Sequence, residues 1–181
     1  MLPALAGCGT KPVEIPPPVE VVDYRTPVVG GSVMNDGRKI GGTAKGKLGD
    51  ELTNSFFSLC INKAALVDEY EGNKPGRGNL YLVAEVALAN ALDKPVPIWS
   101  NELLLQWGNG DRDFGYPIEK FADTQMDDEC SLPVEGRITG DILFEVPAPE
   151  GSNEYNISYQ EFYEDDVEGN TFYVIFSLEA S

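Results

Sequence analysis

Residues 79–88, NLYLVAEVAL, are the stretch that decides the fold. Successive side chains of a β-strand point to opposite faces, so a period of two places alternate residues on one face. The apolar residues of this stretch follow that period at Leu80, Leu82, Ala84, Val86 and Leu88. The stretch therefore predicts a strand with one buried face, close to the centre of a sheet.

Five further stretches have a similar pattern. Residues 137–146 alternate with Ile138, Ile142, Phe144 and Val146 on the inner face. The other candidate strands are residues 56–67, 102–107, 155–162 and 171–178. An acidic segment, residues 164–170, separates the last two and is expected to form a hairpin loop. Six or seven strands at this spacing predict an all-β antiparallel sandwich or barrel of about seven strands.

The N-terminal part has a different composition. Residues 9–47 are rich in proline and glycine and show no sustained apolar period, so they cannot bury enough surface to form a core. This pattern predicts a flexible tether over residues 9–47 and a folded domain over residues 48–181. Residues 1–8 are interpreted as the remnant of an export signal.

That export signal is inferred from Leu5-Ala6-Gly7-Cys8, an aliphatic residue and two small ones before a cysteine. The tetrapeptide resembles the lipobox of bacterial lipoproteins, in which the cysteine receives the lipid. Only seven residues precede Cys8 and none is basic, whereas a complete signal has a basic region and an apolar stretch. Cys8 is the predicted lipidation site, and an incidental terminal thiol is the alternative.

The order of motifs in the domain also resembles a known family. Residues 94–98 (KPVPI), 103–105 (LLL), 107–110 (WGNG) and 132–136 (LPVEG) precede the strand at 138–146. This order is similar to a family of secreted bacterial lipoproteins of unknown function, related to a mycobacterial immunoprotective extracellular antigen. The resemblance implies an immunoglobulin-like β-sandwich over about residues 49–178. It supplies no catalytic residues.

Charge and composition exclude several classes of function. The chain has 13 basic and 30 acidic residues, a net charge of −17, and no histidine. A strongly negative protein repels phosphate backbones, so no nucleic-acid partner is expected. The absence of histidine removes Ser-His-Asp, Cys-His and histidine-based zinc chemistry. We expect no cofactor, apart from the calcium sites considered below.

Cys60 and Cys130 are the cysteines that remain if Cys8 carries lipid. An exported domain with two thiols favours one disulfide, which would close a loop of about 70 residues. The alternative is two free thiols, with Cys60 buried in its strand and Cys130 in a polar loop.

Two acidic loops partly match a calcium-binding pattern. Asp111 and Asp113 stand at alternate positions in one loop, and Asp166 and Glu168 do so in the other. Neither loop supplies the acidic residue that the twelfth position of a calcium loop requires. Weak Ca²⁺ binding is one interpretation of these loops, and ordinary solvated loops are the other.

Aromatic residues are concentrated near the C-terminus. Strand alternation assigns about half of them to the core and turns Tyr163 and Tyr173 outward. These two tyrosines could line a binding surface for a peptide or glycan, or simply form cross-strand pairs.

These observations favour a lipoprotein that is extracytoplasmic, either lipid-anchored to a bacterial cell membrane or secreted. We expect a non-catalytic binding or adhesion-type module with a protein or glycan ligand. The alternatives are a secreted hydrolase that uses two carboxylates without histidine and a structural spacer.

Overall fold

The structure is a computed structural model that describes residues 25–179. Its fold is all-β. Within that range no helix is long and apolar enough to cross a membrane. The strands are β1 (Val29–Val33), β2 (Lys39–Gly46), β3 (Glu51–Thr53), β4 (Phe57–Val67), β5 (Asn79–Asn90), β6 (Val96–Trp99), β7 (Leu103–Gln106), β8 (Phe114–Gly115), β9 (Glu129–Leu132), β10 (Arg137–Pro147), β11 (Ser152–Phe162) and β12 (Glu168–Glu179). One short 3-10 helix, η1 (Ser100–Glu102), lies between β6 and β7.

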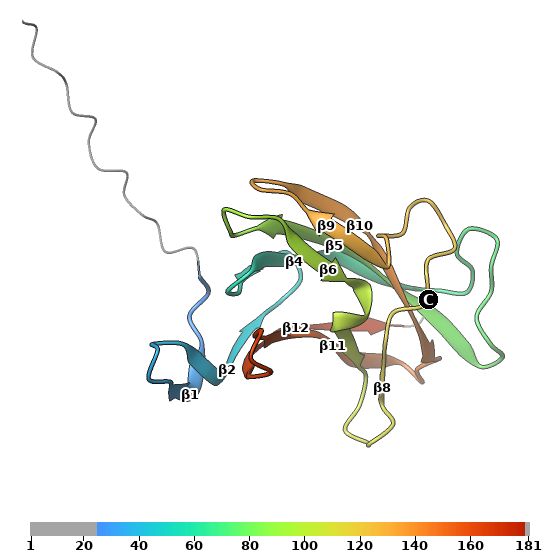
Figure 1. The fold of residues 1–181 in the computed structure, drawn as a ribbon. Helices are drawn as coiled ribbons and strands as arrows, with labels where there is room; N and C mark the ends of the chain where they lie inside the picture. The colour runs from blue at the N-terminus through green and yellow to red at the C-terminus, as the bar shows by residue number, and fades with distance from the viewer. Residues whose placement is uncertain (1–24, 180–181) are drawn as a thin grey trace, which may run out of the picture.

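The strands form two packed layers. One sheet has the order β1-β2-β12-β11-β7-β8, and the other has the order β10-β5-β4-β3. β6 and β9 form a separate two-stranded ladder. Figure 1 shows the layer with β11 and β12 beneath the layer with β4, β5 and β10. The structure thus confirms the predicted β-sandwich.

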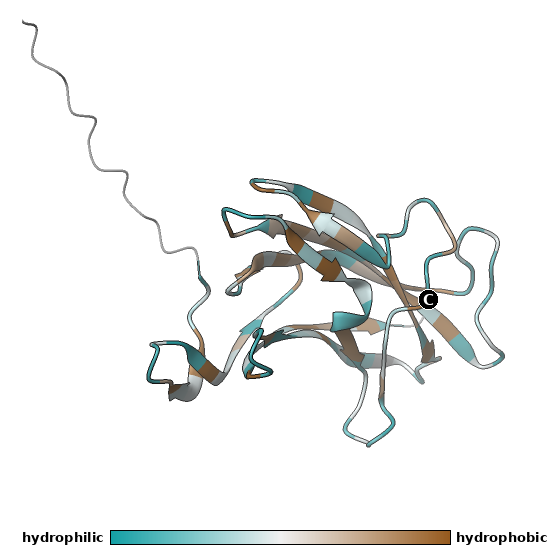
Figure 2. Cartoon of the chain, viewed as in Figure 1, coloured by the Kyte–Doolittle hydropathy of each residue, from teal (hydrophilic) through white to brown (hydrophobic). Residues whose placement is uncertain are grey.

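β5 is the central strand, as its period of two predicts. It pairs with β10 on one side and with β4 on the other, along almost its whole length. Leu82, Ala84 and Val86 are completely buried, and they belong to the same hydrophobic core as Ile157 and Val174 of the opposite sheet. Figure 2 shows hydrophobic positions at intervals along the strands of both layers. All six strands predicted from alternation are present, with small changes at their ends.

The predicted boundary at residue 48 is wrong, because the sandwich already includes β1 and β2. β2 joins the first sheet by pairing in parallel with β12, where Ala44 lies opposite Phe172 and is only 3% exposed. The pairing buries small residues, so no alternation of large apolar residues marks β2 in the sequence. The parallel pair also means that the sandwich is not purely antiparallel. Of the predicted tether, residues 9–24 lie outside the described residues.

The predicted disulfide is absent, since Cys60 and Cys130 are both free thiols. Cys60 stands between Leu59 and Ile61, which both belong to the core, so its side chain points to the outer face of the sheet. There its thiol donates to Oδ1 of Asn62 at 3.3 Å. Cys130 lies on β9 and packs against the core. The two side chains therefore point to different faces of the fold.

The β1–β2 hairpin depends on two glycines with positive φ. Gly30 has φ +75° and Gly31 has φ +77°. A Cβ on Gly30 would meet no atom within 4 Å, whereas a Cβ on Gly31 would lie 2.6 Å from the backbone nitrogen of Gly42 and collide with the carbonyl of Ile40. Glycine is therefore required at position 31, both because φ is positive there and because β2 leaves no space for a Cβ.

We predict that Gly31→Ala loosens the hairpin more than Gly30→Ala. Both substitutions incur the backbone strain of about 1–2 kcal/mol for a left-handed residue, but only Gly31→Ala adds a collision with β2. Amide hydrogen exchange should be faster in residues 39–46 of Gly31→Ala. Equal exchange in the two variants would contradict the collision.

A second prediction concerns the thiols. Alkylation in denaturant without a reductant, followed by peptide mass mapping, should label both Cys60 and Cys130. A peptide pair linked through these two residues would contradict the assignment of both cysteines as free thiols.

Candidate functional site

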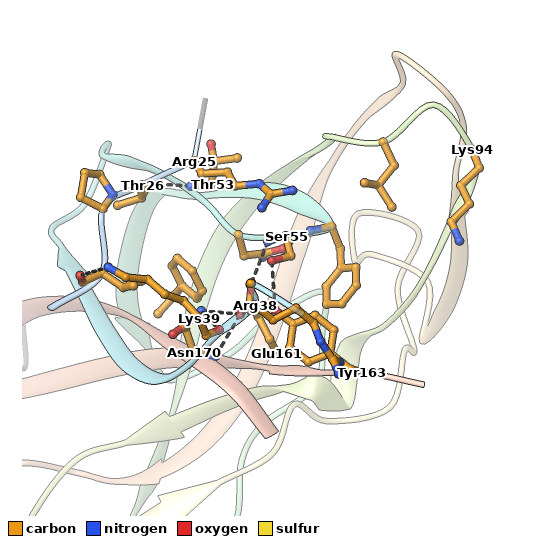
Figure 3. Close-up of a pocket in the computed structure, with 17 residues that line it drawn as sticks. Arg25, Thr26, Arg38, Lys39, Thr53, Ser55, Lys94, Glu161, Tyr163 and Asn170 are labelled. Atoms are coloured by element: carbon orange, nitrogen blue, oxygen red, sulfur yellow. Dashed lines mark hydrogen bonds between the residues drawn. The ribbon is translucent and has the colours of Figure 1, made fainter. Parts of the chain in front are cut away.

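A pocket of about 680 Å³ opens at one end of the sandwich. Its walls come from segments far apart in the sequence, namely residues 25–28, 37–39, 53–56, 92 and 94, and the β11–β12 hairpin at 161–172. Figure 3 shows the labelled side chains around it, with Lys39 and Lys94 on opposite sides. The volume lies within the range of about 300–1,000 Å³ that is typical of small-molecule sites.

The carboxylate of Glu161 organises the wall of this pocket. Glu161 is 1% exposed and lies where the register of β11 and β12 shifts, between Gln160 and Phe162. A bulge of this kind redirects a side chain. Oε1 accepts the backbone N–H of Ser55 at 2.7 Å, and Oε2 accepts the backbone N–H of Asn170 at 2.9 Å. Oε2 also accepts Nδ2 of Asn170 at 2.8 Å and the hydroxyl of Tyr163 at 3.3 Å.

Asn170 extends this network to β2. Its Oδ1 accepts the backbone N–H of Gly42 at 3.1 Å, and its Nδ2 also donates to the carbonyl of Lys39 at 3.0 Å. Glu161 and Asn170 thereby connect the β3–β4 turn, the β11–β12 hairpin and β2. The pocket lies where these three segments meet.

Arg38 and Tyr163 form the outer part of the wall. The guanidinium lies 4.7 Å from the centre of the Tyr163 ring and binds Asp165 through both terminal nitrogens, at 3.1 and 2.7 Å. Nε donates to Asp36 at 2.7 Å. Hydrogen bonds from Arg38 lower the pKa of Asp165 and of Asp36, and the two carboxylates raise the pKa of Arg38. Burial raises the pKa of the Tyr163 hydroxyl.

The structure separates the two tyrosines proposed for a binding surface. Tyr163 lines the pocket, with its ring centre 5.7 Å from that of Phe56. Tyr173 lies between the buried residues Phe172 and Val174, so it points to the outer face of β12, where it stands opposite Ser158 and Lys45. The two side chains do not share a site.

The positive charge of the pocket was not predicted from the sequence. The lining includes four of the chain's 13 basic residues and one of its 30 acidic residues. The basic residues are Arg25, Arg38, Lys39 and Lys94. They lie in three separate segments of an acidic sequence, so no local run of positive charge could have predicted the cluster.

The loops proposed for calcium do not form a site among residues 25–179. No group of three or more acidic or cysteine side chains there could surround a metal ion. Asp113 accepts the backbone N–H of Gly110 at 2.7 Å, and Glu168 accepts Nε2 of Gln160 at 3.3 Å. Asp166 occupies a turn position with φ +59°, and Asp111 is exposed. The predicted lipidation site, Cys8, lies outside the described residues.

Comparison with known proteins finds likeness in solved structures alone. No protein-family model matches the chain, and no curated protein sequence is significantly similar to it. The crystal structure of ycdA from Bacillus subtilis, a proposed lipoprotein, aligns with a TM-score of 0.53 at 16% identity over 68% of this chain. The alignment spans 38% of ycdA. At this identity the likeness establishes the fold alone.

Two further solved structures align less closely. The yjhA protein of Bacillus subtilis has a TM-score of 0.47 at 14% identity, over 75% of this chain and 99% of that one. An uncharacterized β-sandwich protein of Clostridium difficile 630 has a TM-score of 0.44 at 10% identity, over 76% and 93%. The comparisons do not confirm the predicted relation to the mycobacterial antigen family.

We predict that Glu161→Gln lowers the free energy of unfolding by about 2–4 kcal/mol, because a neutral amide leaves buried N–H donors unsatisfied. Urea unfolding measures the effect. Glu168→Gln is the matched control, since Glu168 lies exposed in the same hairpin and should change stability little. Equal stability of the two variants would show that the buried network does not stabilise the fold.

Proposed function

We propose that this protein is a non-catalytic binding module, and that the pocket at the end of the sandwich is its ligand site. The observation that carries the proposal is a cavity of about 680 Å³ whose wall is fixed by the buried Glu161–Asn170 network. A wall held in this way needs little reorganisation to bind a ligand, which lowers the entropic cost of binding.

The alternatives find less support in the same pocket. A carboxylate-based hydrolase needs two facing acids about 5–9 Å apart, whereas Glu161 is the single carboxylate among the described lining residues. Its oxygens already accept four hydrogen bonds. A pure spacer has no need of a cavity. We therefore favour binding over both alternatives.

We also propose an extracytoplasmic location, with lipid attached at Cys8 as the membrane anchor. The lipobox-like residues 5–8 support this proposal, and so does the likeness of the fold to ycdA, a proposed lipoprotein. A small molecule suits a pocket of this volume better than the protein or glycan ligand expected from the sequence. Such ligands would instead require a flat or extended surface.

The uncharged dye N-phenyl-1-naphthylamine tests the proposed site, because its fluorescence rises in an apolar pocket. We expect saturable binding of one dye per chain. Phe56→Ala should weaken binding by about tenfold, since Phe56 contributes an aromatic wall. The matched control is Phe162→Ala, which removes an exposed ring of β11 that does not line the pocket.

The melting temperature of each variant must stay above the assay temperature, so that the dye reports on the folded protein. No saturable binding to the unmodified chain, or equal loss in Phe56→Ala and Phe162→Ala, would overturn the assignment of the pocket as the ligand site.

A further inference from the structure

We propose that the ligand of this pocket is a free small molecule that carries an anionic group on an apolar body. The inference rests on the proposed function, because it names the class of ligand for the same site.

The charged residues that line the pocket are mostly basic, whereas those of the whole protein are mostly acidic. The pocket is lined by four basic residues and one acidic residue, whereas the whole chain has a net charge of −17. Such an arrangement is electrostatically unfavourable for an anion at long range and favourable only inside the site. Asp36 and Asp165 bind Arg38 beside the pocket, so the local excess of positive charge comes mainly from Lys39 and Lys94.

The two lysines of the described lining remain available to a ligand. Nζ of Lys39 has only a long contact, 3.4 Å, to the carbonyl of Val28. Lys94 forms no ion pair with any residue of the described range 25–179. Arg38 differs, because Asp36 and Asp165 already bind its guanidinium. Because Lys39 and Lys94 lie on opposite sides of the pocket (Figure 3), we assign them as the two cations that attract the anionic group, either of which is available to contact it.

The acidic residue of the lining does not cancel this charge at the pocket surface. Glu161 is 1% exposed, and its two oxygens accept four hydrogen bonds from the protein. Beside it, Asn54 is 2% exposed and its Oδ1 accepts the backbone N–H groups of Phe56 and Phe57. The wall thus contains one buried donor, Nδ2 of Asn54, that has no acceptor among the described residues.

Part of the remaining lining is apolar, and it indicates an apolar body for the rest of the ligand. Phe56, Leu92 and Phe172 contribute aromatic and aliphatic walls. Burial of apolar surface favours binding, so a purely ionic ligand would leave the apolar part of the pocket unused. An anion attached to an aromatic or aliphatic body would use both parts of the pocket.

A pair of dyes with one scaffold tests the inference. 8-Anilinonaphthalene-1-sulfonate is N-phenyl-1-naphthylamine with a sulfonate added. We expect the sulfonate dye to bind the unmodified chain at least about fivefold more tightly than the uncharged dye. The double variant Lys39→Gln/Lys94→Gln should weaken binding of the sulfonate dye by about tenfold and leave that of the uncharged dye unchanged.

The matched control is Lys45→Gln/Lys47→Gln, which changes the net charge equally at exposed positions outside the pocket. Binding of the sulfonate dye to this control should remain near that of the unmodified chain. Raising NaCl from about 0.05 M to about 0.5 M should weaken the binding of the sulfonate dye but not that of the uncharged dye, because salt screens exposed charges.

The outcomes separate the two proposals. Equal binding of both dyes, insensitive to Lys39 and Lys94, would overturn the anionic ligand and leave the binding pocket intact. Failure of both dyes to bind would overturn the proposed function itself. The protein can also be sedimented with phosphatidylglycerol vesicles. If it sediments with them and Lys39→Gln/Lys94→Gln does not, the two lysines bind a membrane surface, and the proposal of a free small-molecule ligand is overturned.

Discussion

The pocket end of the sandwich depends on one buried carboxylate. A carboxylate removed from water needs hydrogen-bond donors, since an unpaired buried charge is very costly. Glu161 finds them in the backbone of Ser55 and in Asn170, two segments that the chain brings together only when folded. Space for this arrangement requires Gly169, because a Cβ there would lie 2.7 Å from Oε2 of Glu161. The carboxylate thus determines how the hairpin, the turn and β2 meet.

This arrangement separates the stable body of the protein from its proposed binding site. The apolar core lies between the two sheets, where β5 is paired on both sides. The pocket borders the core at the end of the layers, where Phe172 belongs to both, and its wall also depends on polar contacts and on the Arg38–Tyr163 stack. Changes to Lys39 and Lys94 are therefore expected to leave the core unaffected, since neither side chain belongs to it.

Strands with regular alternation were predictable, and strands without it were not. Residues 79–88 and 171–178 each bury one face, so their apolar period is visible in the sequence. β2 has the sequence KIGGTAKG and packs through small residues against β12, so its composition resembles a flexible segment. β6 contains Pro97, which a strand interior normally excludes. It is tolerated because β6 pairs with β9 alone, which leaves one edge of the strand without a ladder.

The sequence by itself determined the all-β class and excluded histidine chemistry, because both follow from local periodicity and composition. Only the tertiary structure decided that Cys60 and Cys130 point to different faces, and that Tyr163 lines a pocket while Tyr173 does not. It also decided that Arg38, Lys94 and Glu161 line one site. The physical reason is that these relations depend on how sheets and loops pack across more than a hundred residues of chain. A periodic pattern specifies the face of a strand, but not which distant segment packs against it.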